Sequence, residues 1–203
     1  MRFALVIFAF LWILAPANAQ DQTATDLPSH EALFNSGLEF GIFLDNAERR
    51  KEMWHDNYGK GMLPEDLKDR AATVGGTWYL LAVAVDGCSD SVNTIPYLAH
   101  LAAGVEGIEM RVVHPDEGRH IMENHPTPDG RPSTPTVLVL NDQFEKVGVF
   151  IERPDALQEW ALGEGKELSS SDFMTAKFDW YDNDLGKLTM EAVIEIIESA
   201  GSQ

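Results

Sequence analysis

The side chain best suited to covalent chemistry in this sequence is that of Cys88, the only cysteine among 203 residues. A strand-like apolar run, 78–85, and a polar Asp86-Gly87 turn precede it. The tetrad Cys88-Ser89-Asp90-Ser91 then leads into an apolar-periodic segment typical of a helix. Helix N-termini carry unpaired N–H groups and partial positive charge, and a thiol placed there ionises more readily. The spacing therefore indicates a nucleophilic thiol at a strand-to-helix junction.

A lone thiol is compatible with two different roles. It cannot form a disulfide within its own chain, so in an exported protein it would form an intermolecular disulfide or stay free and reactive. The alternative is an inert cysteine that packs as a small apolar side chain. Two neighbouring side chains have opposite expected effects on the pKa of the thiol. Ser91 could donate a hydrogen bond to the thiolate and lower the pKa, whereas an ionised Asp90 would disfavour the thiolate and raise it.

The first residues have the pattern of a targeting segment. Arg2 supplies a positive start, residues 3–14 are continuously apolar, and Ala17-Asn18-Ala19 forms an A-x-A cleavage signal. The apolar run is short for a membrane-spanning helix. We therefore predict that residues 1–19 are a cleaved signal peptide, that the mature protein begins at Gln20, and that it is periplasmic or secreted without a stable membrane anchor.

The charge of the chain excludes one class of partner. The formal net charge is −18, which repels the phosphate backbone of nucleic acids. We therefore expect no nucleic-acid partner, and the acidic surface is consistent with high solubility.

Hydrophobic periodicity predicts helices before a βαβαββα core and one more helix after it. The expected elements are helices at 30–54 and 64–74, strands at 77–85, 108–113, 136–140 and 147–151, helices at 90–103, 117–124 and 155–162, a loop at 163–175, and a helix capped by Thr189. Pro96 is expected to kink the helix in which it lies. The predicted units are a helical extension at 20–76, a core at 77–162 and a C-terminal loop and helix at 163–203.

Two prolines in fixed relation to the cysteine carry a family resemblance. Pro96 lies eight positions after Cys88, and Thr134-Pro135-Thr136 stands directly before the third core strand. With the C-x-x-S tetrad, these features resemble thioredoxin-like proteins, over about residues 40–160, and most of all a bacterial branch with a W-C-G-D-S motif. The resemblance implies an α/β thioredoxin-like fold with a mixed four-stranded sheet. It also implies that Pro135 is cis and that Thr134 offers backbone groups to an extended substrate.

Three residues around Cys88 differ from the family pattern. Gly87 replaces the tryptophan before the cysteine, Ser91 replaces the second cysteine, and Ala82 stands where dithiol thioredoxins often have a buried aspartate. The resemblance then implies an exported monothiol thiol–disulfide oxidoreductase acting through Cys88, with Ser91 and Asp90 tuning the thiol. Its partner would be a disulfide-containing protein or a low-molecular-weight thiol, with no cofactor. The alternative is a non-catalytic module that binds extended peptides, so the sequence leaves open whether the protein is an enzyme.

Other polar clusters give weaker signals. His114, His120 and His125 lie within twelve residues, but their spacing matches no metal motif, so we predict surface histidines and no metal site. The loop with His125 is expected near Cys88, yet no third group is evident to orient the histidine for hydrolysis. The acidic segment 179–186 fails the register of a calcium loop and is predicted to be a turn.

Overall fold

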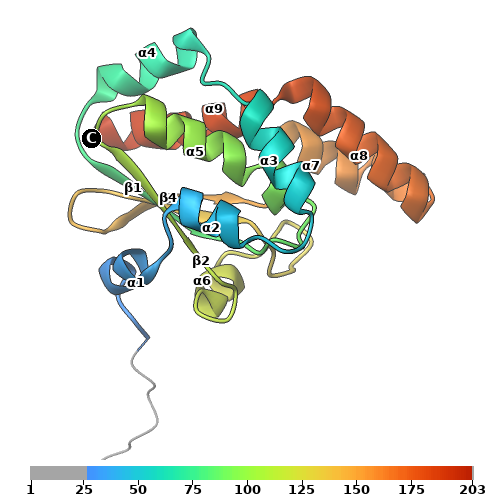
Figure 1. Ribbon diagram of the computed structural model, residues 1–203, viewed down its shortest axis with the longest axis horizontal. Helices are drawn as coiled ribbons and strands as arrows, with labels where there is room; N and C mark the ends of the chain where they lie inside the picture. The colour runs from blue at the N-terminus through green and yellow to red at the C-terminus, as the bar shows by residue number, and fades with distance from the viewer. Residues whose placement is uncertain (1–26, 203) are drawn as a thin grey trace, which may run out of the picture.

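Four strands form one mixed sheet in the computed structural model, which describes residues 27–202 (Figure 1). The spatial order is β2-β1-β3-β4, with β1 (Trp78–Val83) parallel to β2 (Ile108–Val113). β1 is antiparallel to β3 (Thr136–Leu140), which is antiparallel to β4 (Lys146–Ile151). This confirms the predicted architecture and the bounds of the second and third strands. The predicted signal peptide lies outside the described residues.

The central strands are apolar on both faces because helices cover both. On one face, β1 and β3 pack against α5 (Ile95–Gly104) and α9 (Lys187–Gly201). On the other, they pack against α1 (His30–Ser36) and α6 (Arg119–Asn124). Residues alternate between the faces, as the period of a strand requires. Leu80, Ala82, Val137 and Val139 face α5 and α9, and Leu81, Val83, Leu138 and Leu140 face the opposite way.

The single helix predicted at 30–54 is wrong, because three short helices occupy this region: α1, α2 (Phe40–Asn46) and α3 (Lys51–Lys60). Ser29 caps α1 as predicted, accepting a hydrogen bond from Ala32 N. Gly37 then ends α1 in an extended conformation, and Leu38 forms an isolated antiparallel bridge with Val112 of β2. Arg50, with φ 54°, separates α3 from α2. α4 (Glu65–Val74) follows and leads into β1.

The helix predicted at 90–103 is also divided. A 3₁₀ turn, η1 (Ser91–Asn93), comes first, and α5 begins after Thr94, whose φ/ψ of −125°/−56° is not helical. Pro96 therefore lies in the first turn of α5, where its missing N–H would have had no helical partner. The predicted kink inside a continuous helix is wrong for this reason.

The loop predicted at 163–175 and the acidic turn predicted at 179–186 are wrong as well. Residues 164–167 form a 3₁₀ turn, η2 (Glu164–Glu167), and α8 (Ser170–Asp184) follows with Ser169 as its N-cap. α8 shows little amphipathic pattern, because its only buried residues are Lys177 and Tyr181. Gly186, at φ 72°, turns the chain into α9, which begins before the predicted Thr189. None of the helices described between residues 27 and 202 is long and apolar enough to cross a membrane.

Candidate functional site

Cys88 lies just beyond the C-terminal end of β1 and is half-buried. Its backbone is held on both sides, since Cys88 N donates to Val85 O (3.1 Å) and Val92 N donates to Cys88 O (3.2 Å). Ser91 N also approaches the sulfur, at 3.4 Å from Sγ. A backbone N–H aimed at the sulfur stabilises negative charge there. The turn thus fixes the thiol and supplies one donor to it.

The peptide bond between Thr134 and Pro135 is cis, as the family resemblance implied. Antiparallel pairing of β3 with β1 brings this bond beside the cysteine, because Thr136 pairs with Val83. The Cys88 thiol donates a hydrogen bond to Thr134 O over 3.1 Å. The structure therefore brings together three of the residues predicted for the site, Cys88, Ser91 and Thr134, with Pro135 directly behind Thr134.

The segment before α3 wraps the turn that precedes the cysteine. Asp86 Oδ2 accepts from Glu48 N (3.0 Å) and Arg49 N (2.8 Å). Partial burial raises the pKa of Asp86, but these backbone N–H groups outweigh it and leave the pKa below its ordinary value. Arg50 Nε donates to Gly87 O over 2.9 Å. A Cβ at Gly87 would lie 2.4 Å from Arg49 Cζ, so the Arg49 guanidinium fills the space that a larger residue before the cysteine would need.

Asp90, the third residue of the tetrad, is buried with 5% exposure and is directed at groups from the C-terminal part of the chain. Its carboxylate accepts from Arg153 Nε (2.9 Å), Lys177 Nζ (2.8 Å) and Tyr181 OH (2.9 Å). Lys177 Nζ also donates to Ser89 Oγ over 2.8 Å. α8 therefore holds the tetrad through two side chains one helical turn apart.

The pKa values in this cluster are displaced in opposite directions. Burial raises the pKa of Asp90, but the positive charges of Lys177 and Arg153 and their hydrogen bonds outweigh it, so the pKa lies below its ordinary value. Burial, together with the Asp90 charge, raises the pKa of Tyr181 well above its ordinary value. Asp90 is therefore anionic at neutral pH, while Tyr181 stays protonated and donates to it.

A second acid extends the cluster to the loop that carries the cis peptide bond. Glu152, 4% exposed, lies 3.3 Å from Arg153 and 3.1 Å from Arg131. Glu152 N donates to Pro135 O over 2.8 Å. We call Asp90, Glu152, Arg153 and Lys177 the buried ion cluster, and Arg131, whose side chain is 48% exposed, extends it at the surface. It joins the loop before Pro135, the end of β4 and α8 to the tetrad, so the two halves of the site have shared supports.

Ser91 and Asp90, the two residues predicted to tune the thiol, make other contacts than the sequence predicted. Ser91 is fully buried, and its Oγ has no hydrogen-bond partner among residues 27–202, so the backbone N–H is the donor to the sulfur instead. The Asp90 carboxylate is neutralised by two cations rather than left as a free charge beside the thiol. Ala82, buried on β1, provides no ionisable group beneath the cysteine.

Of the three histidines predicted at the surface, His114 is exposed, whereas His120 and His125 are half-buried, and no hydrogen bond among the described residues joins them to Cys88. His125 Nδ1 lies 2.8 Å from Ile121 O, and its Nε2 lies 2.9 Å from Lys146 Nζ. His114 is exposed and pairs with Asp116. No group of three His, Cys, Asp or Glu side chains within the described residues could hold a metal ion.

Sequence reasoning missed Arg153, Lys177 and Tyr181 as parts of the site. The one signal that could have found the last two is their spacing, because Phe173, Lys177 and Tyr181 recur every four residues and so share a helix face. Because a loop was predicted at 163–175 and a turn at 179–186, no helix face was expected here. The partner of Lys177, Asp90, stands 87 residues earlier.

A family model described as thioredoxin matches residues 37–172. None of the curated proteins compared matches the chain. Among solved structures, a protein of unknown function from Pseudomonas aeruginosa is 22% identical, with a TM-score of 0.66, and the match covers 85% of this chain and 99% of that one. An HIV epitope scaffold is 21% identical, with a TM-score of 0.62 and the same coverage. At this level of identity the two structures show a shared fold.

Proposed function

Because the chain belongs to the thioredoxin family, we propose that it is a monothiol thiol–disulfide oxidoreductase that acts through Cys88. The observation that carries the proposal is the 3.1 Å contact between Cys88 Sγ and Thr134 O, beside the cis bond to Pro135. Cys88 is half-buried rather than enclosed, and the proposed reaction requires that a disulfide reach its sulfur. In this proposal the backbone of Thr134 pairs with an extended chain next to the sulfur.

The reaction proceeds by two kinds of thiol–disulfide exchange. The Cys88 thiolate attacks one sulfur of a client disulfide, forming a mixed disulfide and releasing the other client sulfur as a thiolate, which takes up a proton. A low-molecular-weight thiol such as glutathione then attacks the Cys88 sulfur and releases the client as a dithiol. A second molecule of that thiol regenerates Cys88 and leaves as its own disulfide. In sum, one client disulfide is reduced and two small thiols are oxidised.

The small thiol is needed because the chain has no second cysteine to resolve the mixed disulfide. Ser91 occupies the place of the resolving residue and contributes its backbone N–H to the sulfur. A thiolate formed at Cys88 would keep this donor, whereas its own donation to Thr134 O would end on ionisation. Asp90 acts as a positioning residue, since its contacts with Lys177 and Arg153 fix the turn that carries Cys88.

The compartment is part of the same proposal. The A-x-A pattern at Ala17-Asn18-Ala19 supports cleavage before Gln20 and export to the periplasm or medium. Expression of the full chain in a bacterial host, followed by mass measurement of the secreted or periplasmic protein, tests this. A mature mass that still includes residues 1–19 would refute the cleavage.

The test of activity is glutathione-dependent reduction of insulin by the wild type and by Cys88→Ser. We expect turnover from the wild type and only the uncatalysed rate from Cys88→Ser. A Ser171→Ala variant is the matched control, because it removes a hydroxyl from an exposed residue of α8 outside the tetrad and leaves the sulfur. Equal rates for wild type and Cys88→Ser would refute the catalytic proposal and favour the alternative of a peptide-binding module.

A further inference from the structure

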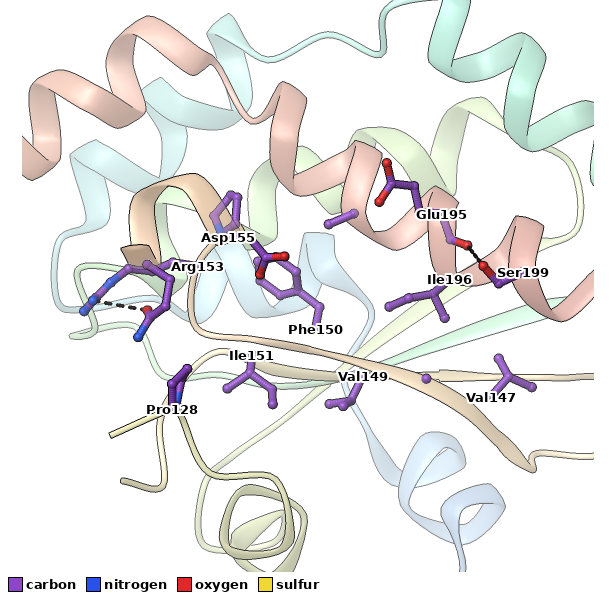
Figure 2. A pocket seen from close by; sticks show the side chains of 14 residues that line it. Pro128, Val147, Val149, Phe150, Ile151, Arg153, Asp155, Glu195, Ile196 and Ser199 are labelled. Atoms are coloured by element: carbon purple, nitrogen blue, oxygen red, sulfur yellow. Dashed lines mark hydrogen bonds between the residues drawn. The ribbon is translucent and has the colours of Figure 1, made fainter. Parts of the chain in front are cut away.

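A groove of about 450 Å³ lies on the outer side of β4, and Cys88 is not among the residues that line it (Figure 2). β4 is the edge strand of the sheet, with β3 on its inner side. α9 runs above the strand, and Ile196 and Phe150 lie between them, while Val149 and Ile151 point to the other side (Figure 2). Pro128 lies at one end of the groove (Figure 2). An exposed strand edge beside apolar side chains is a surface to which an extended chain can add.

Hydrogen bonding along β4 shows which backbone groups face the groove. Glu152 N donates to Pro135 O, and Ile151 is opposite Thr136. Donors and acceptors alternate between the two sides of an antiparallel strand. The backbone groups of Val149 and Ile151 therefore point outward, and of these Ile151 O accepts from Arg153 N. Among residues 27–202, the N–H and C=O of Val149 have no partner strand and are left to pair with one.

An unpaired side-chain donor in the same groove points to a ligand with acceptors. Gln158 of α7 (Asp155–Leu162) lines the groove and is 7% exposed. Its Oε1 accepts from Arg153 Nη1 over 3.4 Å, which fixes the amide orientation because a guanidinium can only donate. Its Nε2 is buried without a hydrogen-bond partner in the described part of the chain. A buried donor without a partner is destabilising, and a peptide carbonyl in the groove would satisfy it.

The charge of the groove favours a basic partner over a second copy of the chain. Asp155 and Glu195 line it, whereas its one cation, Arg153, is already paired with Asp90 and Glu152. A second copy of the chain would bring the same carboxylates and a further formal charge of −18 to the surface. Like charges brought together in this way oppose association. A basic partner is attracted instead.

We propose that the outer edge of β4 binds an extended segment of a basic partner protein by strand addition. The backbone of Val149 pairs with the added strand, and Gln158 Nε2 donates to one of its carbonyl oxygens. Asp155 and Glu195 attract lysine or arginine side chains of that segment. The site uses neither Cys88 nor Thr134 and does not depend on the thiol chemistry proposed above.

The binding test uses a fluorescein-labelled hexapeptide of alternating valine and lysine with the full-length protein, followed by fluorescence anisotropy. We expect saturable binding that weakens with salt, and none for the peptide with glutamate in place of lysine. Methylating the two central backbone nitrogens of the peptide should weaken binding by about fivefold, because adjacent N–H groups of an extended chain point to opposite sides and only one of the two can donate to Val149 O. Cys88→Ser should bind the peptide as the wild type does.

Variants and amide exchange locate the site. Glu195→Lys should weaken binding by about threefold or more, whereas Glu159→Lys, an exposed residue of α7 outside the groove, should leave it unchanged. Gln158→Met should weaken binding by about fivefold, since one hydrogen bond is lost. In the wild type, peptide should slow the exchange of the Val149 N–H in NMR spectra.

Three results would overturn the proposal. Binding that is insensitive to backbone methylation would show charge attraction without strand pairing. Protection of Thr134 in place of Val149 would assign the peptide to the site beside Cys88. Protection of Val149 in the absence of peptide, rising with protein concentration together with a dimer in sedimentation, would make a second copy the occupant.

Discussion

Replacing Asp90 by asparagine tests whether the buried ion cluster holds the tetrad. Asparagine keeps the size of the side chain and one carbonyl oxygen, but it removes the negative charge between Arg153 and Lys177. It also presents N–H groups where three donors converge: Arg153 Nε, Lys177 Nζ and Tyr181 OH. Two cations whose side chains are 9% and 3% exposed would lose a shared counter-ion.

The expected loss is large because the cluster is buried. Removing one partner of a buried ion pair destabilises a protein by about 3–5 kcal/mol, since the other charge stays desolvated without compensation. Arg153 keeps the carboxylate of Glu152 at 3.3 Å. Lys177 keeps no carboxylate among the described residues, only Ser89 Oγ at 2.8 Å and the Phe173 and Phe178 rings about 6 Å away, so it carries most of the loss. At an m-value of about 2 kcal/mol/M, the urea midpoint should fall by about 1.5–2.5 M.

Urea unfolding followed by tryptophan fluorescence measures this loss, with Asp116→Asn as the matched control. Asp116 also pairs with an arginine, but its side chain is 74% exposed, so its replacement should change stability by less than about 1 kcal/mol. The double variant Asp90→Asn/Lys177→Met should recover part of the loss, because both charges are then absent. A loss below about 1 kcal/mol for Asp90→Asn would refute the reasoning and indicate a solvated cluster.

The pH dependence of the same measurement follows from the pKa of Asp90. Burial raises this pKa, but Lys177 and Arg153 lower it further, so the folded value lies below the unfolded value of about 3.9. A depressed carboxyl pKa stabilises the fold above the unfolded value, and this contribution is lost as pH falls through the folded value. The stability difference between wild type and Asp90→Asn should therefore shrink on acidification below about pH 3.9.

Two further predictions concern Gly186, which precedes α9, and Asp129, which lies in the loop before Pro135. Gly186→Ala should destabilise the protein by about 2 kcal/mol or more, since its φ is 72° and a Cβ would lie 2.1 Å from Tyr97 Cγ. The control Gly41→Ala, with nothing within 4 Å of its Cβ, should be neutral or stabilising in thermal unfolding. Asp129 should titrate at about 2 in carboxyl NMR spectra, because Thr127 Oγ1 and then Arg131 hydrogen-bond its carboxylate. Thr127→Val should raise that pKa, and an unchanged value would contradict the assignment of the hydroxyl as the main cause.

The core of the fold could be predicted from sequence because its signals are local. The strands at 108–113 and 136–140 are apolar runs bounded by turns, and their bounds match β2 and β3. The resemblance to thioredoxin-like proteins implied the cis bond before Pro135, which the structure has. The division of the N-terminal helix was not predicted, because apolar spacing continues across Gly37 while the Leu38 bridge to Val112 depends on tertiary structure.

The support of the site could not be predicted for a different reason. Lys177 and Tyr181 are polar residues in a helix with few buried apolar side chains, so hydrophobic periodicity gives them no inward direction. Their burial depends on Asp90, which was predicted at the start of a helix as a group that acts on the thiol. The burial of each charge can be explained only when its partner is known. A single sequence does not indicate which charged residues far apart in the chain form a pair.

The 87 residues between Asp90 and Lys177 also set an order of events during synthesis. At about 5–20 residues per second, a ribosome adds the lysine about 4–17 s after the aspartate. For that interval the nascent chain has the cysteine and its turn but lacks the cation on α8 that encloses them. A polypeptide that stops at the last strand would have the same deficit permanently. The smallest fragment with a complete tetrad support therefore extends through Tyr181, about thirty residues beyond β4.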